Sequence, residues 1–251
     1  MLLRWLFIDK NTLQSLQSAQ TATTISASSL ATNGSSTPSS NFAYSIWFYI
    51  NDWNYRYGEQ KIIMGRSGTA MASESMTSGS GANSGATGTT TNMNNPQDLS
   101  KLQPCPFVVL GGKENNLTIA VTCYTNASTN SQGIVHYLEI VNIPIQRWVN
   151  LFFSVYGRTL DVYLDGKLVR TGILPGTAKI NPTANIYLTP NGGFNGWTSK
   201  LQYWNNSSNP QMAWDTYMAG YGAGLFSNLF GKYKIKVALL TDNQEKAQFT
   251  L

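Results

Sequence analysis

The acidic residues are the first place to look for chemistry, because hydrolysis of a glycosidic bond uses two carboxylates, about 5 Å apart in retaining enzymes. A single strand presents such a pair when acidic residues alternate along it. The glutamates of the chain are Glu59, Glu74, Glu114, Glu139 and Glu245, and none has an acidic residue two positions away. No single strand supplies the pair, so we expect a protein that is not an enzyme. A pair assembled from two strands stays open as an alternative.

The other residue types that carry chemistry stand alone. His136 is the sole histidine, and no cysteine, aspartate or second histidine stands at ligand spacing from it, which favours an ordinary strand histidine. No glycine-rich phosphate-binding motif occurs. Asp52 and the segment Asn191–Asn195 offer the oxygen ligands that Ca²⁺ prefers, but their spacing matches no carboxylate cluster. We therefore expect no cofactor and no metal, and the sequence does not support a Ca²⁺ site.

The charge distribution argues against a nucleic-acid partner, and the N-terminal run argues against a transmembrane span. Charged residues make up 12% of the chain, and the Lys and Arg residues behind the net charge of +5 are scattered singly. Scattered charges are typical of a solvated surface, so no nucleic-acid partner is expected. The N-terminal run MLLRWLFI contains Arg4 and is much shorter than the ~20 apolar residues of a spanning helix. It also lacks a signal-peptide cleavage site, so we expect no transmembrane span and no usual secretion signal.

Two tracts differ from the rest of the chain in composition. Residues 11–41 and 65–104 are rich in Ser, Thr, Ala, Gln, Asn and Gly and lack the apolar periodicity that buries one face of an element. Both are expected to be extended loops or linkers. Ordering such segments costs roughly 1–2 kcal/mol per residue, which a partner surface would have to offset.

The remaining segments carry strand signals, which are runs of aromatic and β-branched residues. The expected strands are residues 42–50, 61–65, 106–112, 117–124, 136–143, 148–156, 160–164, 167–171, 185–189, 199–204 and 232–240. One short helix is expected over Asn209–Ala219, because Pro210 stands near its start and Gly220 follows its end.

Two hairpins have a predictable register. Asp165-Gly166 is a strong signal for a two-residue type I′ turn, which needs positive φ at both central residues. The pairs expected from this turn are Leu164 with Lys167, Val162 with Val169, and Asp161 with Arg170 as an ion pair. A second hairpin whose loop is centred at Glu114 places Cys105 opposite Cys123. Opposed Cβ atoms lie about 4.5–5.5 Å apart, so both a disulfide and two free buried thiols stay open.

Three segments together resemble a known family. Residues 148–171 (WVNLFFSVYGRTLDVYLDGKLVRT) contain the pattern YxDGxxV, residues 42–50 (FAYSIWFYI) contain Trp47, and residues 194–222 run from a glycine turn through an aromatic strand to a short helix. These segments resemble, in the same order, parts of concanavalin A-like, laminin-G-like lectin and glucanase domains. The resemblance implies an all-β fold, a two-sheet antiparallel jelly-roll sandwich. It divides the chain into an extended segment 1–41 and a sandwich 42–251 with a low-complexity insertion at 66–103.

Sugar-binding members of such families stack aromatic rings on their ligands. The residues of this chain that could do so are Trp197, Tyr203 and Trp204, which are glycan-rim candidates. The same residues could instead pack inside the sandwich, as aromatic side chains commonly do.

The end of the chain, from Trp214 onward, is similar to the tails of laminin-G-like proteins of large double-stranded DNA viruses, which occur among virion components. This resemblance implies a minor capsid protein, a non-enzymatic structural component that binds other capsid proteins. It would be located in the virion, and in the host cytoplasm during assembly. The alternative is a lectin-like module that binds glycans.

Overall fold

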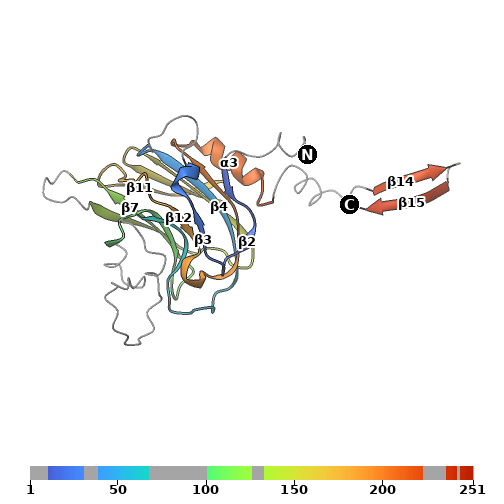
Figure 1. Cartoon of the computed structure of the whole chain (residues 1–251), viewed down its shortest axis with the longest axis horizontal. Helices are drawn as coiled ribbons and strands as arrows, with labels where there is room; N and C mark the ends of the chain where they lie inside the picture. Colours follow the sequence, from blue (N-terminus) through green and yellow to red (C-terminus); the bar gives the residue numbers. More distant parts are fainter. Residues whose placement is uncertain are drawn as a thin grey trace.

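The computed structural model describes residues 11–30, 39–67, 101–125 and 133–222, and the backbone of two strands within 236–250. The described chain is almost entirely antiparallel β-structure in two packed sheets, with one short α-helix (Figure 1). This confirms the expected β-sandwich. No helix among the described residues is both long enough and apolar enough to span a bilayer.

The first sheet has seven strands and carries the face discussed below. Its path is β1-β13-β4-β9-β10-β11, and β2 also pairs with β13. The strands are β1 (Thr12–Gln14), β2 (Gln17–Ser18), β4 (Phe42–Asp52), β9 (Trp148–Tyr156), β10 (Thr159–Leu164), β11 (Lys167–Ile173) and β13 (Asn195–Trp204).

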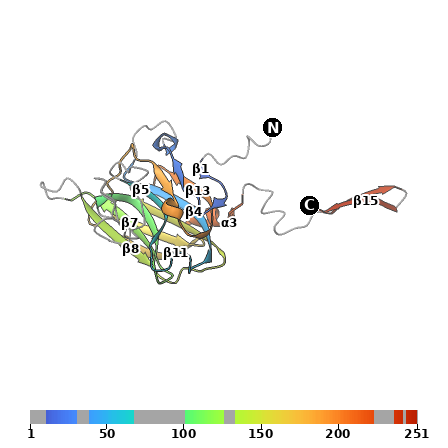
Figure 2. The same cartoon turned by 60° about the horizontal axis from the view of Figure 1, so that its bottom comes forward.

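The second sheet has six strands in the order β3-β12-β5-β6-β7-β8. They are β3 (Thr23–Ile25), β5 (Lys61–Ser67), β6 (Pro104–Leu110), β7 (Leu117–Cys123), β8 (Ile134–Ile140) and β12 (Ile186–Leu188). The two sheets pack face to face, with the green strands β7 and β8 in one and β4 and β13 in the other (Figure 2). Phe48 and Phe153 from the first sheet share one core with Val108 and Ile119 from the second.

The remaining elements are the 3-10 turns η1 (Ala27–Leu30) and η2 (Pro190–Gly192), the helix α3 (Pro210–Met218) and the strands β14 (Lys236–Thr241) and β15 (Gln244–Thr250). The sequence segment that contains β14 was expected to complete the sandwich. Instead β14 pairs with β15 in a separate two-stranded sheet.

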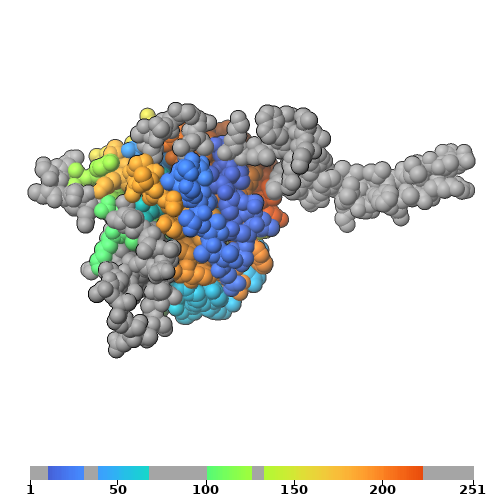
Figure 3. All heavy atoms as spheres, in the orientation of Figure 1, coloured from blue at the N-terminus to red at the C-terminus, as the bar shows by residue number. Residues whose placement is uncertain are grey.

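Residues 11–30 are part of the sandwich, in contrast to the extended N-terminal segment expected for residues 1–41. β3 pairs with β12, and the carbonyl of Asn11 accepts a hydrogen bond from the Tyr203 amide of β13 at 3.1 Å. Figure 3 shows this segment in blue along the surface beside orange residues. Main-chain hydrogen bonds to sheet edges need no apolar periodicity, so composition did not reveal these strands. Ala19 and Ile25 also enter the core. Of the expected insertion, residues 68–100 lie outside the described residues.

The β10–β11 hairpin confirms the expected turn but not the expected pairing beyond it. Asp165 and Gly166 both have positive φ, 50° and 73°, and the pair next to the turn is as predicted. The register then shifts, because a bulge on β11 leaves Val169 without a direct partner. The observed pairs are Leu164 with Lys167, Tyr163 with Leu168, Val162 with Arg170, and Asp161 with Thr171.

The predicted Val162–Val169 and Asp161–Arg170 pairs are therefore wrong. The Asp161 carboxylate accepts a hydrogen bond of 2.6 Å from the Thr171 hydroxyl, and Arg170 donates to the Glu139 carbonyl at 2.6 Å. A bulge inserts one residue on one strand only, and turn chemistry carries no signal for it.

The six-stranded sheet contains a buried arginine. Arg66, on β5, is 1% exposed, and its guanidinium donates to the carbonyls of Ala184 at 3.1 Å and Pro182 at 3.4 Å. These carbonyls offset part of the cost of burying the charge. Burial raises the pKa of the Tyr203 hydroxyl, and Arg66 opposes that rise.

The two cysteines are buried free thiols, and the expected register is off by one residue. Phe107 pairs with Ala120 and Leu110 with Leu117, because the loop is centred between residues 113 and 114 and not on Glu114. The Cys105 thiol hydrogen-bonds to the backbone of Thr122, the neighbour of Cys123. The pKa of Cys105 is raised to about 12, chiefly by burial and further by Cys123. Burial also raises the pKa of Cys123.

We expect both thiols to resist a water-soluble thiol reagent in the folded protein. The thiolate is the reactive form, and a raised pKa keeps it scarce until the pH approaches the folded-state value. At about pH 8.5, where an ordinary thiol is half ionised, native labelling of Cys105 should be roughly a thousandfold slower than labelling in urea. Native labelling at the unfolded rate, or fewer than two free thiols in urea without reductant, would contradict this account.

Candidate functional site

The outer face of the seven-stranded sheet is built by the alternation of side chains along β4. Ile46 and Phe48 point into the core, so Ser45, Trp47 and Tyr49 lie on the opposite face. β4 sits between β13 and β9, which continue the same face on either side. The face therefore collects side chains from three adjacent strands.

Three aromatic residues form a row across these strands, which we call the aromatic row: Trp197 of β13, Tyr49 of β4 and Trp148 of β9. Trp197 pairs directly with Tyr49, and Tyr49 pairs with Trp148. The ring centroids of Tyr49 lie 5.5 Å from Trp197 and 5.8 Å from Trp148, both in edge-to-face geometry. Trp197 is 42% exposed, so the row presents a rigid apolar platform to solvent.

The next row toward α3 is more polar, and we call it the polar row: Ser199, Trp47 and Asn150. These residues are again direct cross-strand partners on the same face. The Asn150 side-chain amide donates to the Ser45 hydroxyl at 3.0 Å. All three residues of the row are buried.

One ion pair flanks this region. Arg147, which precedes Trp148, binds the Asp165 carboxylate at 2.5 Å. The other oxygen of that carboxylate accepts the Asn150 backbone N–H at 2.9 Å. Asp165 thus ties the type I′ turn to the start of β9 and neutralises Arg147.

The helix α3 covers the half of the outer face that lies beyond the polar row, away from the aromatic row. Asn209 caps its N-terminus by accepting the Met212 N–H at 2.9 Å, and Pro210 occupies the first turn, where it has no hydrogen bond to lose. Gly220 ends the helical segment with φ 70°. Ala213 packs on Phe152 and Tyr163 of the sheet. Burial raises the pKa of Tyr163, and the Asp161 carboxylate raises it further.

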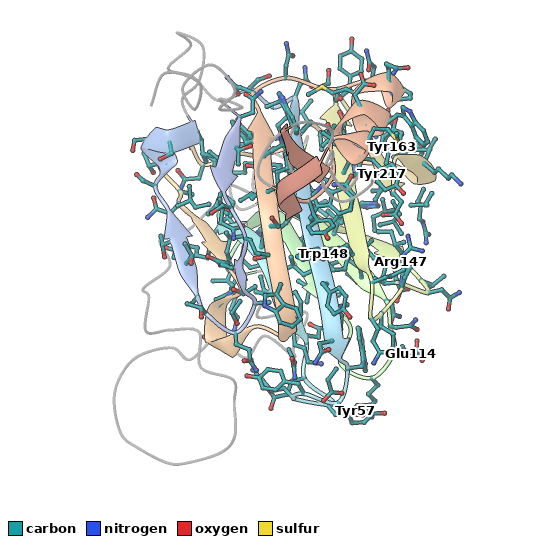
Figure 4. The ribbon with its side chains drawn as sticks, turned by 90° about the vertical axis from the view of Figure 1, so that its right-hand side faces the viewer. Tyr57, Glu114, Arg147, Trp148, Tyr163 and Tyr217 are labelled. Atoms are coloured by element: carbon teal, nitrogen blue, oxygen red, sulfur yellow. The ribbon has the colours of Figure 1, made fainter. Side chains whose placement is uncertain are left out.

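Two tyrosines from α3 and its end lie over the polar row and the aromatic row. Tyr217 stacks on Trp47, with centroids 5.7 Å apart and planes at 19°. Tyr221 stacks on Trp148, with centroids 4.4 Å apart and planes at 11°. In Figure 4, Trp148 lies on the sheet face below Tyr217, with Arg147 beside it and Glu114 and Tyr57 at the far rim. Only part of the face is therefore open to a ligand.

The three predicted glycan-rim residues have different places. Trp197 lies on the outer face and is exposed, as a stacking residue must be. Tyr203 is 1% exposed inside the core and donates to the Asn205 side chain at 3.0 Å, so it is wrong as a rim residue. Trp204 is partly buried against Phe152 and belongs to the cluster under α3.

The irregularity of β13 explains this division. Strict alternation would put Trp197 and Tyr203 on the same face. Lys200 has φ 50°, and the register shifts between Ser199 and Gln202, so the strand changes phase at this bulge.

Sequence reasoning missed Tyr49, Trp148 and Tyr221 as site residues. The alternation of residues 42–50 was available and places Tyr49 opposite the core-facing side chains. The pairing of β4 with β9 and β13, which brings Trp148 and Trp197 into one row, has no local signal in the sequence.

Two glutamates, Glu114 and Glu139, lie close together away from this face. Glu114 and Glu139 both accept hydrogen bonds from the Asn116 side chain, at 3.3 Å and 2.6 Å. They come from a loop and from β8, so a pair from separate elements does exist. Both side chains are exposed, whereas a hydrolytic pair flanks a bound substrate. Glu59 binds Arg56 at 2.6 Å.

No group of three or more His, Cys, Asp or Glu that could hold a metal ion occurs among the described residues. At the Ca²⁺ candidates, Asp52 accepts the Asn54 N–H at 2.9 Å, and the Asn191 carbonyl accepts a hydrogen bond from Arg56. These oxygens take part in the local fold of the loop.

Comparison with known proteins identifies similar structures but no family. No protein-family model matches the chain, and no curated protein matches it significantly. One similar solved structure is the ligand-binding domain of botulinum neurotoxin serotype D in complex with N-acetylneuraminic acid (TM-score 0.52, 9% identity), covering 82% of this chain and 42% of that one. Another is the receptor-binding domain of botulinum neurotoxin D (TM-score 0.52, 10% identity), covering 81% and 43%. The chain spans less than half the length of these proteins, and at such identity the likeness shows the fold alone.

Because Asn209 begins the helix that covers the face, removing its cap should loosen that cover. We expect Asn209→Ala to lower the free energy of unfolding by about 1 kcal/mol. Asn209→Asp retains the acceptor and should stay near the wild type. Urea unfolding followed by tryptophan fluorescence measures both. Equal stability of the Ala and Asp variants would show that the cap does not hold α3.

Proposed function

We propose that the chain is a non-enzymatic, lectin-like module that binds a neutral glycan on the aromatic row. The observation that carries this proposal is the row itself, with Trp197, Tyr49 and Trp148 side by side on three adjacent strands. Sugar rings present apolar C–H faces, and rigid aromatic rings bury such faces at a low cost in conformational entropy. Ser199 and Asn150 lie in the next row, where both are buried and bonded within the protein, so the exposed ring of Trp197 is the part of the site that a ligand reaches first.

The charges beside the row favour a neutral sugar. Arg147 is paired to Asp165 at 2.5 Å, so its guanidinium is already neutralised. A carboxylated sugar would have to compete with Asp165 for this cation. The similar neurotoxin domain was solved with an acidic sugar, N-acetylneuraminic acid. The likeness to that domain is one of fold, and the paired state of Arg147 is the reason why a neutral sugar is proposed for this chain.

We expect Trp197→Ala to weaken binding of neutral oligosaccharides roughly tenfold or more, as truncation of an exposed aromatic anchor commonly does. The measurement is isothermal titration with lactose, N-acetyllactosamine, cellotetraose and laminaritetraose, and with sialyllactose as the acidic comparison. Tyr124→Ala is the matched control, because Tyr124 is 52% exposed and lies at the end of β7, in the other sheet. Binding of sialyllactose alone, or an equal loss in both variants, would contradict the proposal.

The module should bind glycans without cleaving them. We expect no release of reducing sugar from laminarin or cellotetraose, because the Glu114–Glu139 pair is exposed on the opposite sheet. A retaining β-glucanase serves as the positive control for the assay. Turnover that disappears in Glu139→Gln, with the glycan affinity unchanged, would show instead that the protein is an enzyme.

A structural role in a virion, bound to other capsid proteins, stays a prediction from the sequence. The described feature that favours a protein partner is the edge strand β11, where Leu168, Val169 and Ile173 are exposed apolar side chains. If a virus encodes the chain, mass spectrometry of its purified virions tests this role, because a capsid component must be detected in them. Absence of the chain from such particles would exclude it.

A further inference from the structure

Two buried polar atoms in the polar row have no hydrogen-bond partner. They are the indole Nε1 of Trp47, which is a donor, and the Oδ1 of Asn150, which is an acceptor. Trp47 is 4% exposed and Asn150 is fully buried. Buried polar groups in folded proteins are nearly always paired, and leaving one unpaired is costly. The protein itself therefore leaves the hydrogen-bonding capacity of these two atoms unused.

The geometry limits what that partner can be. Trp47 and Asn150 are directly opposed residues of β4 and β9 on one face, so their Cβ atoms lie about 4.5–5.5 Å apart. A single group that bridges the two atoms would have to accept from the indole N–H and donate to the amide oxygen. A hydroxyl group does this, whereas a carboxylate only accepts and an ammonium only donates.

The cover over these atoms includes the side chain of Tyr221. Its ring lies 5.9 Å from the Trp47 ring and stacks on Trp148 at 4.4 Å, so it covers Trp148 at the edge of the indole, while Tyr217 stacks on the face of Trp47. Two hydrogen bonds hold this segment on the sheet: Ser199 Oγ donates to the Tyr221 carbonyl at 2.7 Å, and Lys200 Nζ donates to the Gly220 carbonyl at 3.3 Å. Tyr221 itself is 45% exposed.

We propose that Trp47 and Asn150 form a subsite for one hydroxyl group of a neutral sugar, and that Tyr221 covers it. A sugar ring that stacks on Trp148 takes the place of the Tyr221 ring, and one of its hydroxyls accepts from Trp47 Nε1 and donates to Asn150 Oδ1. This inference rests on the proposed function, because it adds a second subsite next to the aromatic row. It assigns to Tyr221 the role of an internal competitor for the ligand.

The test compares variants by isothermal titration with lactose, N-acetyllactosamine, cellotetraose and laminaritetraose. Tyr221→Ala removes the competitor and should tighten binding of at least one of these sugars about tenfold. Adding Trp47→Phe to Tyr221→Ala removes the indole donor and should reverse that gain. Trp53→Phe is the matched control, since Trp53 Nε1 is also buried without a hydrogen bond but lies beside Lys61, outside the two rows. Adding this control to Tyr221→Ala should leave the gain unchanged.

The outcomes separate this inference from the proposed function. If the wild type binds and Trp197→Ala weakens binding, but Tyr221→Ala gives no gain, only the present inference fails. A gain that survives Trp47→Phe also overturns it, because the indole N–H then contributes nothing to binding. If neither the wild type nor Tyr221→Ala binds any of the sugars, both proposals fail. If urea titration shows that the Trp47 variant is not folded, Asn150→Leu is added to Tyr221→Ala in its place. This substitution removes the amide acceptor and should likewise reverse the gain in affinity.

Discussion

Strand β4 is hydrogen-bonded between β13 and β9, and the burial of its inward side chains determines which of its residues lie on the outer face of the sheet. Ile46 and Phe48 are buried in the shared core of the two sheets, and each such side chain contributes about 1.5–3 kcal/mol by leaving water. A shift of one residue would expose them and bury Trp47 and Tyr49 in their place. The register of β4 against β9 and β13 is therefore strongly determined. The aromatic row is the outer side of the same alternation that forms the core.

The outer face of the seven-stranded sheet has one half that α3 covers and one half that carries the aromatic row. α3 packs on Phe152 and Tyr163 and completes a second small core there, so that half behaves as ordinary protein interior. The half that carries the aromatic row remains accessible at Trp197. Between the halves, the polar row combines complete burial with unpaired atoms, and the Tyr221 ring lies over its edge. This boundary is where we propose that a sugar hydroxyl binds.

The sequence predicted the fold wherever a local signal was sufficient. The strand over residues 42–50, the Asp165-Gly166 turn and the helix that Pro210 and Gly220 indicated all rest on local signals, and all are confirmed. Local signals did not predict the pairing of residues beyond a bulge, where one strand has one residue more than its partner. The bulge at Val169 broke the predicted β10–β11 pairs, and the bulge at Lys200 placed Tyr203 in the core.

The candidate site was only partly predictable for a related reason. Trp197 was identified by its residue type alone, while Tyr49 and Trp148 become its neighbours through pairings between strands that are far apart in the chain. Residues 11–30 were missed because main-chain hydrogen bonds to the sheets hold strands with few apolar side chains. In both cases long-range pairing decided the outcome, and a single sequence records no long-range pairing.

The central claim is that the aromatic row is the glycan-binding surface, and the indole N–H resonances of the seven tryptophans test it most directly. In a ¹⁵N-labelled sample, each resonance can be assigned by a single Trp→Phe substitution and followed during titration with a neutral oligosaccharide. The account predicts that Trp197 and Trp148 shift with saturation, while Trp53 and Trp204 stay in place. Saturable binding that leaves Trp197 and Trp148 unshifted would contradict it.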